Sequence, residues 1–441
     1  MTPPVVPSSA SAEPGTGPLK VMVCDDSAVI RGLLTRALEA ENDISVVASV
    51  ANGEMAINAL KRHAVEVIVL DIEMPVMDGL TALPKLVSAD PDIQIIMAST
   101  LTLQNAEVSL KALAAGASDY IAKPTSRSEI HSADEFRREL VMKVRGLGAE
   151  RRRRSGGVMP TVPPAGLAAG SPVGSPVGST ATASPASRPD AARAPSPLPR
   201  RGAPGEVAKE RAEPAQAKTP AAPAHIATRT DPRSREKKPV VLRRPGTDRP
   251  EILAIGSSTG GPQALFNVLS HVKDKVRVPI VVTQHMPATF TTILAEHIAR
   301  SSGVVAAEGQ DGEPVERDRI YVAPGDFHMT VAEENGRRII RLLQTPPENF
   351  CRPSVDPMLR SLVQLYGRRI LTVILTGMGQ DGLNGCQEVV DAGGTVVAQD
   401  EATSVVWGMP GAVAMAGLCS AVLPIDQIGP HLLKTAVSAA A

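Results

Sequence analysis

One short stretch of the chain has the residue types and spacing of a nucleophilic site. Residues 256–260 read G-S-S-T-G, which satisfies the G-x-S-x-G spacing of a nucleophile elbow centred on Ser258. A strand-to-helix turn of this kind lifts the serine hydroxyl out of a sheet and leaves free N–H groups beside it, where they can stabilise a negatively charged oxygen. The pentad also fits an anion-binding turn or a merely tight turn. A dinucleotide site is disfavoured, because G-x-G-x-x-G needs glycine where Ser258 stands.

An imidazole and a carboxylate in later loops could complete an acyl-transfer site. His285 follows the apolar run 279–283, and Asp381 follows the run 370–375. An imidazole with a pKa near working pH can remove the serine proton, and a carboxylate can hold the imidazole in the required tautomer. The order serine, histidine, aspartate differs from that of α/β-hydrolases, which argues against that fold. Spacing alone leaves competing assignments open, namely Ser257, Asp326, His328 and Asp356.

The elements that must position these groups are strands of a parallel sheet. Residues 252–255 form an apolar run closed by glycine, which is typical of a buried parallel strand, and Pro262 suits the first turn of a helix. Apolar side chains then recur at helical spacing up to residue 272. Further strands are predicted at 279–283, 319–323, 370–375 and 395–398. Because sites in such sheets form at the carboxyl ends of the strands, Ser258, His285 and Asp381 are expected to meet near one crevice.

The first part of the chain carries a second set of polar groups, again at predicted strand ends. Apolar runs that alternate with helical patterns end in Asp25 and Asp26, in Asp71, in Ser99 and in Lys123. Three converging carboxylates need a hard cation, and an oxygen-rich site with few protein ligands suits Mg²⁺. With that cation, an ammonium group and a hydroxyl, the sheet edge suits a phosphoryl acceptor. Taken singly, these groups also fit helix-capping aspartates and a surface lysine.

Four motifs in this region resemble those of response-regulator receiver domains. They are D-D at 25–26, L-D-I-E-M-P-x-M-D-G at 70–79, A-S-T at 98–100 and K-P at 123–124, within residues 18–138. The resemblance implies that a partner histidine kinase supplies phosphate to Asp71. It also implies an Mg²⁺ site made by Asp25, Asp26, Asp71 and the backbone carbonyl of Glu73, and a switch made by Ser99, Tyr120 and Lys123.

Between the two regions the composition is that of a flexible linker. The helical pattern of the first domain fades after Leu140, and residues 139–249 are rich in proline, alanine and arginine, so no core is expected there. About 100 flexible residues would have an end-to-end span of roughly 50–60 Å. A passive tether is the preferred interpretation, and weak attraction to anionic lipid or an acidic partner is the alternative. Residues 1–17 are predicted to be disordered, and residues 250–437 to form the second domain.

The overall composition disfavours several classes of function. The 441 residues include 46 basic and 46 acidic side chains, a balance that indicates neither nucleic-acid nor membrane binding. The first 18 residues lack the features of a signal peptide, and no apolar run approaches a membrane span. The four cysteines form no C-x-x-C pair, which favours a reducing cytoplasm. No basic recognition helix follows the linker, which argues against a transcriptional regulator.

Six ordered motifs in the second domain resemble those of the chemotaxis protein-glutamate methylesterases. They are G-S-S-T-G-G at 256–261, T-Q-H-M-P at 283–287, A-P-G-D-x-H-M at 323–329, R-P-S-V-D at 352–356, I-L-T-G-M-G-x-D-G at 374–382 and G-M-P-G-A-V at 408–413. The resemblance implies that Ser258 is the nucleophile, His285 the base and Asp381 the acid that orients the base, with Thr259 and Met378 near the oxyanion. It also implies that the esterase site uses no cofactor. Two departures are Ser257, where the family usually has alanine, and a linker far longer than the usual hinge.

These observations predict two doubly wound parallel-sheet α/β domains, a flavodoxin-like receiver and a Rossmann-like methylesterase, joined by a long disordered linker. The resemblance implies a phosphorylation-regulated serine hydrolase that removes methyl groups from glutamate γ-methyl esters of methyl-accepting chemoreceptors, releasing methanol, and that deamidates receptor glutamines during sensory adaptation. The unphosphorylated receiver is expected to shield the crevice. We expect a cytoplasmic monomer with no nucleic-acid partner and no membrane insertion. A non-catalytic receptor-binding scaffold and a methylesterase of a non-chemotaxis sensory array are the alternatives.

Overall fold

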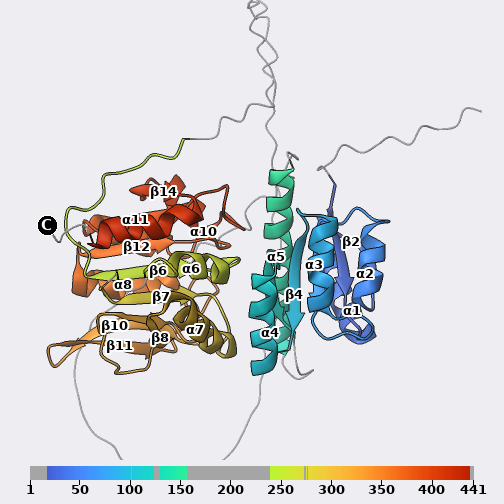
Figure 1. Ribbon diagram of the computed structural model, residues 1–441, viewed down its shortest axis with the longest axis horizontal. Helices are drawn as coiled ribbons and strands as arrows, with labels where there is room; N and C mark the ends of the chain where they lie inside the picture. The colour runs from blue at the N-terminus through green and yellow to red at the C-terminus, as the bar shows by residue number, and fades with distance from the viewer. Residues whose placement is uncertain are drawn as a thin grey trace, which may run out of the picture. The chain divides into compact units, whose positions relative to one another are not determined.

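The computed structural model describes residues 17–100, 102–123, 130–155, 239–272, 275 and 277–437. These residues form two α/β domains (Figure 1). The predicted disordered N-terminus up to residue 16, and the predicted linker from 156 to 238, lie outside the described residues. None of the helices in the described ranges combines the length and the apolar character that a membrane span requires.

The first domain is built on a five-stranded parallel sheet. Its strands are β1 (Leu19–Cys24), β2 (Ile44–Val50), β3 (Val67–Asp71), β4 (Gln94–Ser99) and β5 (Asp119–Ala122). Its helices are α1 (Ala28–Glu39), α2 (Gly53–Leu60), α3 (Gly79–Ala89), α4 (Leu103–Ala114) and α5 (Ile130–Arg154). The strand order is β2-β1-β3-β4-β5, with every neighbouring pair parallel. This is the flavodoxin-like order, so the predicted fold of this domain is confirmed.

Strand β3 delivers Asp71 to the carboxyl edge of this sheet. All five residues of β3, V-I-V-L-D, are buried, as expected for a central parallel strand covered on both faces. Asp78 caps α3 by accepting a hydrogen bond from the N–H of Thr81. A Cβ at Gly79 would lie 2.1 Å from the carbonyl oxygen of Asp71, so only glycine lets α3 begin this close to β3. The D-G pair of the motif therefore sets how closely α3 approaches the acidic end of the strand.

Helix α5 extends beyond the point where the sequence pattern predicts its end. The pattern fades after Leu140, whereas α5 continues to Arg154. Leu140, Val144 and Leu147 form a buried stripe that packs in one cluster with Leu19 of β1. That prediction was wrong because arginines surround the stripe and resemble linker composition, although several of them form ion pairs with acidic residues of the same domain.

The second domain is built on a seven-stranded sheet with a separate two-stranded hairpin. Its strands are β6 (Ile252–Ser257), β7 (Ile280–Gln284), β8 (Val305–Glu308), β9 (Arg319–Val322), β10 (His328–Glu334), β11 (Arg337–Leu343), β12 (Ile370–Ile374), β13 (Thr395–Gln399) and β14 (Ala421–Leu423). Its helices are α6 (Gly261–Leu269), α7 (Ala288–Ser302), α8 (Val355–Tyr366), α9 (Leu383–Asp391), α10 (Met409–Met415) and α11 (Ile425–Val437). The sheet order is β14-β13-β12-β6-β7-β9-β8, and all neighbouring pairs are parallel.

Strand β6 is the centre of this sheet and the point where the chain changes direction. The chain first places β7, the edge strand β8 and β9 on one side of β6, and then returns to place β12 on the other side. Successive residues of β6 alternate between faces: Leu253 and Ile255 pack in one cluster, and Ile252 and Ala254 in the other. The prediction of a doubly wound parallel sheet is confirmed. A crevice at such a switch point is where parallel α/β folds bind ligands.

The hairpin of β10 and β11 was not predicted, although its turn signal is present in the sequence. The two strands pair antiparallel, with Glu334 opposite Arg337, so only Asn335 and Gly336 form the loop. Both loop residues have positive φ, at 51° and 72°, which is the backbone of a tight hairpin turn that favours Asn-Gly. The charged residues on either side of this pair concealed the alternating pattern of the strands.

The last residues of the predicted linker lie against the second domain. The N–H of Gly246 donates a hydrogen bond to Oγ1 of Thr395 over 2.9 Å, and the N–H of Arg243 donates to the carbonyl oxygen of Cys419. The sequence places the linker end at residue 249, whereas the chain is attached to this domain at least from residue 243. Backbone hydrogen bonds hold this segment, and such bonds leave little trace in the composition.

Candidate active site

The imidazole of His285 and the carboxylate of Asp381 are in direct contact. Nε2 of His285 lies 2.7 Å from Oδ2 of Asp381, and the exposed fractions of the two side chains are 10% and 2%. His285 directly follows β7, and Asp381 lies in the loop between β12 and α9. Two of the three groups singled out from the sequence therefore meet at the carboxyl edge of the sheet.

Ser258 lies at the same edge, in the turn between β6 and α6. In the parallel register of β6 and β7, Ser257 is paired with Gln284, so Ser258 and His285 are the next residues along the two strands. The N–H of His285 donates to the carbonyl oxygen of Ser257 over 3.1 Å, which extends the ladder to this point. The hydroxyl of Ser258 makes no hydrogen bond within the described part of the chain, and the residue is only half-buried.

Asp381 is the acceptor for several donors besides the imidazole. Its two carboxylate oxygens accept hydrogen bonds from the Ser354 hydroxyl at 2.7 Å, the Asn349 amide at 2.9 Å, and the N–H groups of Val355 at 2.6 Å and Gly382 at 2.9 Å. Burial by itself raises the pKa of this carboxyl, but the imidazole and these donors outweigh burial and lower the pKa to about 2. Asp381 is therefore held as an anion against the ring. Sequence spacing did not reveal Asn349 or Ser354.

Cys351 is a further neighbour of the imidazole that the sequence interpretation missed. Its sulfur lies 3.4 Å from Nδ1 of His285, the ring nitrogen that Asp381 does not contact. Burial alone lowers the pKa of His285, but the acidic neighbours Cys351 and Asp381 outweigh it and raise the pKa to about 10. The loop that carries this thiol includes Asn349 and Phe350, which have positive φ values of 52° and 64°. The imidazole thus lies between the Asp381 carboxylate and the Cys351 thiol.

Two free backbone donors lie in the loops around Ser258. Among the described residues, the N–H groups of Thr259 and Met378 donate to no acceptor, whereas the N–H of Ser258 donates to the carbonyl oxygen of Thr376. A Cβ at Gly377 would lie 2.9 Å from Cβ of Ser258 and 3.0 Å from its nitrogen, so the two loops approach as closely as glycine allows. The residues expected near the oxyanion position therefore flank Ser258.

The competing candidates have other partners. Both ring nitrogens of the fully buried His328 contact backbone groups, Nδ1 the N–H of Ser354 and Nε2 the carbonyl oxygen of Pro346. Asp326 is paired with Arg352 near the surface. Asp356 accepts hydrogen bonds from the N–H of Gly385 and the amide of Asn349, and the hydroxyl of Ser257 is bound by Gln284. None of these four residues contacts the imidazole of His285 in the described chain.

The first domain has a separate acidic site at the carboxyl edge of its own sheet. Ligand oxygens of Asp25, Asp26 and Asp71 lie within 4.8 Å of one another. The ammonium group of Lys123 lies 2.7 Å from Asp25 and 2.5 Å from Asp71. The Lys123 ammonium contacts only two of the three carboxylates, and the all-oxygen donor set is the kind that Mg²⁺ prefers. The residues present therefore fit the predicted cation.

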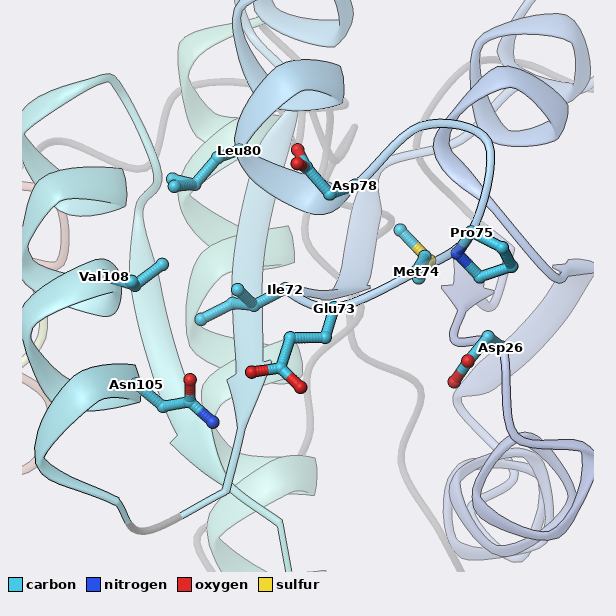
Figure 2. A pocket seen from close by; sticks show the side chains of 9 residues that line it. All are labelled: Asp26, Ile72, Glu73, Met74, Pro75, Asp78, Leu80, Asn105 and Val108. Atoms are coloured by element: carbon cyan, nitrogen blue, oxygen red, sulfur yellow. The ribbon is translucent and has the colours of Figure 1, made fainter.

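Two pockets adjoin this acidic cluster. The smaller one is lined by Asp26, Asp71, Ile72, Glu73, Ser99, Thr100, Asn105 and Lys123. Figure 2 shows its larger neighbour, in which the side chains of Asp26 and Glu73 face the space opposite the apolar Leu80 and Val108. Ser99 and Lys123 thus lie where the sequence predicts them, whereas Tyr120 is buried and does not line either pocket of the described chain. Asn105 was not singled out from the sequence.

Comparison with known proteins assigns both domains. Residues 21–134 match the response regulator receiver domain, and residues 253–432 match the CheB methylesterase family. A protein-glutamate methylesterase/protein-glutamine glutaminase of Azospirillum brasilense is 53% identical over 441 residues, which covers 99% of this chain and 98% of the relative. A protein of the same name from the group 2 operon of Rhodospirillum centenum is 53% identical and covers 97% of this chain and 96% of the relative.

A solved structure is similar to the second domain alone. The crystal structure of the Thermotoga maritima CheB methylesterase catalytic domain is 40% identical, with a TM-score of 0.41, and covers 42% of this chain and 99% of that one. The full-length similarity to the curated relatives, together with the two domain matches, decides the family. This chain belongs to the protein-glutamate methylesterase/protein-glutamine glutaminase family, in which a response regulator receiver domain precedes a CheB methylesterase domain.

Proposed function

We propose that this protein hydrolyses glutamate γ-methyl esters on methyl-accepting chemoreceptors, with Ser258 as nucleophile, His285 as general base and Asp381 as the acid that orients the ring. The observation that carries the proposal is the 2.7 Å contact between His285 and Asp381 beside the Ser258 turn. An anionic carboxylate at one ring nitrogen fixes the tautomer and stabilises the imidazolium that forms during acyl transfer. The names of the full-length relatives support the substrate class.

The contact between the ring and Asp381 supports a role for each nitrogen. Because Nε2 of His285 contacts Asp381, Nδ1 is the nitrogen that takes the proton of Ser258. The serine oxygen then bonds to the ester carbonyl carbon, and the carbonyl oxygen becomes an oxyanion. The N–H groups of Thr259 and Met378, which donate to no acceptor in the described part of the chain, are the donors proposed to hold it.

Collapse of the intermediate completes the reaction in two stages. The bond between the carbonyl carbon and the methoxy oxygen breaks, and the leaving oxygen takes the proton from Nδ1 of His285, releasing methanol. Water, deprotonated by the same nitrogen, then attacks the acyl-serine and frees the glutamate carboxylate and the Ser258 hydroxyl. Attack on a glutamine amide would expel ammonia by the same steps, so we extend the proposal to deamidation of receptor glutamines.

The first domain is proposed to control this reaction. Asp71 is the proposed acceptor of a phosphoryl group from a histidine kinase. Asp25, Asp26, Asp71 and the backbone carbonyl of Glu73 would hold Mg²⁺, which would offset the phosphoryl charge. Lys123 and Ser99, which line the same pocket, follow the phosphoryl oxygens, and Tyr120 belongs to the same switch. We further propose that the unphosphorylated receiver shields the esterase crevice and that phosphorylation exposes it.

The setting is proposed to be a reducing compartment. All four cysteines are free thiols, and together with the chemoreceptor substrate class this supports a cytoplasmic enzyme. We propose that it acts as a monomer.

Methanol release from purified methylated receptor tests the function directly. The parent protein should release methanol, faster with acetyl phosphate, and Ser258→Ala should reduce the rate to background. Equal methanol release by the parent and by Ser258→Ala would contradict the catalytic proposal and favour a scaffold that only binds receptors.

A further inference from the structure

A buried hydroxyl–amide pair lies behind the Ser258 turn, outside the proposed catalytic groups. Ser257, the last residue of β6, and Gln284, the last residue of β7, are directly opposite each other in the parallel register. Their side chains are almost fully buried, with exposed fractions of 0% and 2%. The hydroxyl of Ser257 donates a hydrogen bond to Oε1 of Gln284 over 2.7 Å. A polar pair this deeply buried is stable only while each member keeps its partners.

The amide of Gln284 touches the backbone of both the nucleophile and the base. Its Nε2 donates to the carbonyl oxygen of Ser258 at 2.9 Å and to the carbonyl oxygen of His285 at 3.2 Å. Both hydrogens of the amide nitrogen are therefore used. A flipped amide would point Oε1 at two carbonyl oxygens, and these three acceptors would repel one another. The contacts of Gln284 thus allow one amide orientation only, in which the Ser257 hydroxyl satisfies the remaining oxygen.

The carbonyl group of Ser258 is held from two directions. Besides the amide of Gln284, it accepts a hydrogen bond from the N–H of Gly261 over 2.7 Å. A Cβ at Gly261 would lie 2.0 Å from Oε1 of Gln284 and 2.9 Å from Cβ of Ser257, so the first turn of α6 is packed directly on the pair. The peptide unit that joins Ser258 to Thr259 is consequently locked by both sides of the turn.

Fixing this carbonyl also fixes the direction of an N–H group. A peptide unit is planar and trans, so its C=O and N–H bonds point in opposite directions. When the carbonyl of Ser258 points at Gln284, the N–H of Thr259 must point the other way, away from the buried pair. That N–H is free within the described chain.

We propose that Ser257 and Gln284 are positioning residues that aim the N–H of Thr259 at the oxyanion of the reaction. This inference rests on the proposed function, because it concerns how the same acyl-transfer site is built. Neither side chain touches the reacting atoms; both act through the peptide that follows the nucleophile. The pair matters for the step in which negative charge forms on the carbonyl oxygen, and it has little effect on ground-state binding of the ester.

Two variants of the full-length protein test this role by methanol release in the presence of acetyl phosphate. Ser257→Ala removes the hydroxyl that holds Oε1 and should lower kcat about tenfold, the effect of one ordinary hydrogen bond. Gln284→Glu keeps the shape but turns an acceptor toward the Ser258 carbonyl, and should lower kcat about 100-fold, as misdirecting one oxyanion donor does. In both variants KM should change by less than about twofold, because neither substitution removes a contact with the bound ester in its ground state.

A matched serine variant and an active-site count separate positioning from folding. Ser420→Ala removes a hydroxyl that donates to the carbonyl oxygen of Val396 in the same domain, and it should keep the parent kcat. Titration with a fluorophosphonate, which reacts with an activated serine, gives the concentration of folded sites for each variant. All kcat values are expressed per titrated site.

The outcomes distinguish this inference from the function on which it rests. If the parent protein releases no methanol, the proposed function itself fails. If the parent is active and Ser258→Ala is inactive, but Ser257→Ala and Gln284→Glu keep the parent kcat per titrated site, the positioning role is overturned. The positioning role is also overturned if the loss of activity in the variants equals the loss of titrated sites. It is likewise overturned if the variants change KM alone.

Discussion

The sulfur of Cys351 lies 3.4 Å from Nδ1 of His285, on the ring nitrogen that Asp381 leaves free. In the proposed mechanism this nitrogen must take the proton of Ser258, so the thiol and the nucleophile compete for one base. An acidic group beside the ring stabilises the imidazolium, and the imidazolium is unable to accept a proton. The contact therefore raises the pH at which the base becomes available.

Replacing Cys351 by alanine should shift the acidic limb of the pH–rate profile to lower pH. Burial favours the neutral ring, whereas Cys351 and Asp381 raise the pKa of His285 to about 10, so the rate should rise with pH as the imidazolium loses its proton. Without the thiol the pKa falls, and a larger fraction of neutral base exists at pH 7. The pH profile of kcat/KM for methanol release checks this. Cys419 is a buried cysteine that does not contact the imidazole of His285, so Cys419→Ala is the control and should leave the acidic limb of the profile unchanged. An acidic limb at the parent pH in Cys351→Ala would refute the interpretation.

Replacing Asp381 by asparagine should nearly abolish activity. The carboxylate accepts hydrogen bonds from the ring and from Ser354, Asn349 and backbone N–H groups, and an amide would turn a donor toward some of these donors. Loss of the anion that orients the base costs about 10⁴-fold in kcat in a triad. Single-turnover methanol release measures the effect. Asp391→Asn, at an exposed side chain that pairs with Gln387, is the matched control and should retain the parent rate.

Adding a methyl group at Gly377 should displace the nucleophile turn. A Cβ there would lie 2.4 Å from the sulfur of Met409 and 2.9 Å from Cβ of Ser258, closer than such atoms approach. A displacement of about 1 Å at a reacting group can cost about 100-fold in rate, so Gly377→Ala should lower kcat by that order. Gly32→Ala is the control, because the nearest atom to its Cβ would lie at an ordinary 3.5 Å. A Gly377→Ala variant with the parent kcat would show that the two loops can move apart without consequence.

Phosphodonor stimulation should depend on Asp71 and on a divalent cation. Three carboxylates within 4.8 Å and one ammonium group leave an excess of negative charge that must be offset before phosphate is accepted. Asp71→Asn should keep basal methanol release and lose the increase with acetyl phosphate, and EDTA should remove the increase in the parent. The exposed Asp92→Asn is the control and should respond as the parent does. A full response of Asp71→Asn to acetyl phosphate would disprove the assigned acceptor.

The strand ends were predictable because buried parallel strands have a distinctive apolar sequence pattern. Strand β6 is buried on both faces, so its first four residues, 252–255, read as an unbroken apolar run, and the two serines that follow Gly256 lie at the sheet edge. The same reasoning placed His285 after β7 and Asp71 at the end of β3. It missed the β10–β11 hairpin and ended α5 too early, because charged side chains on the exposed faces obscured the pattern.

The sequence by itself determined the two α/β domains, the loops that carry chemistry and the family to which the motifs belong, since these follow from periodicity and from residues close together in the chain. Only the tertiary structure decided which ring nitrogen of His285 contacts Asp381, that Cys351 contacts the other, and that Ser257 and Gln284 hold the turn from behind. These contacts join residues from separate loops, and their geometry depends on how the strands are ordered and registered in the sheet, which no local pattern encodes.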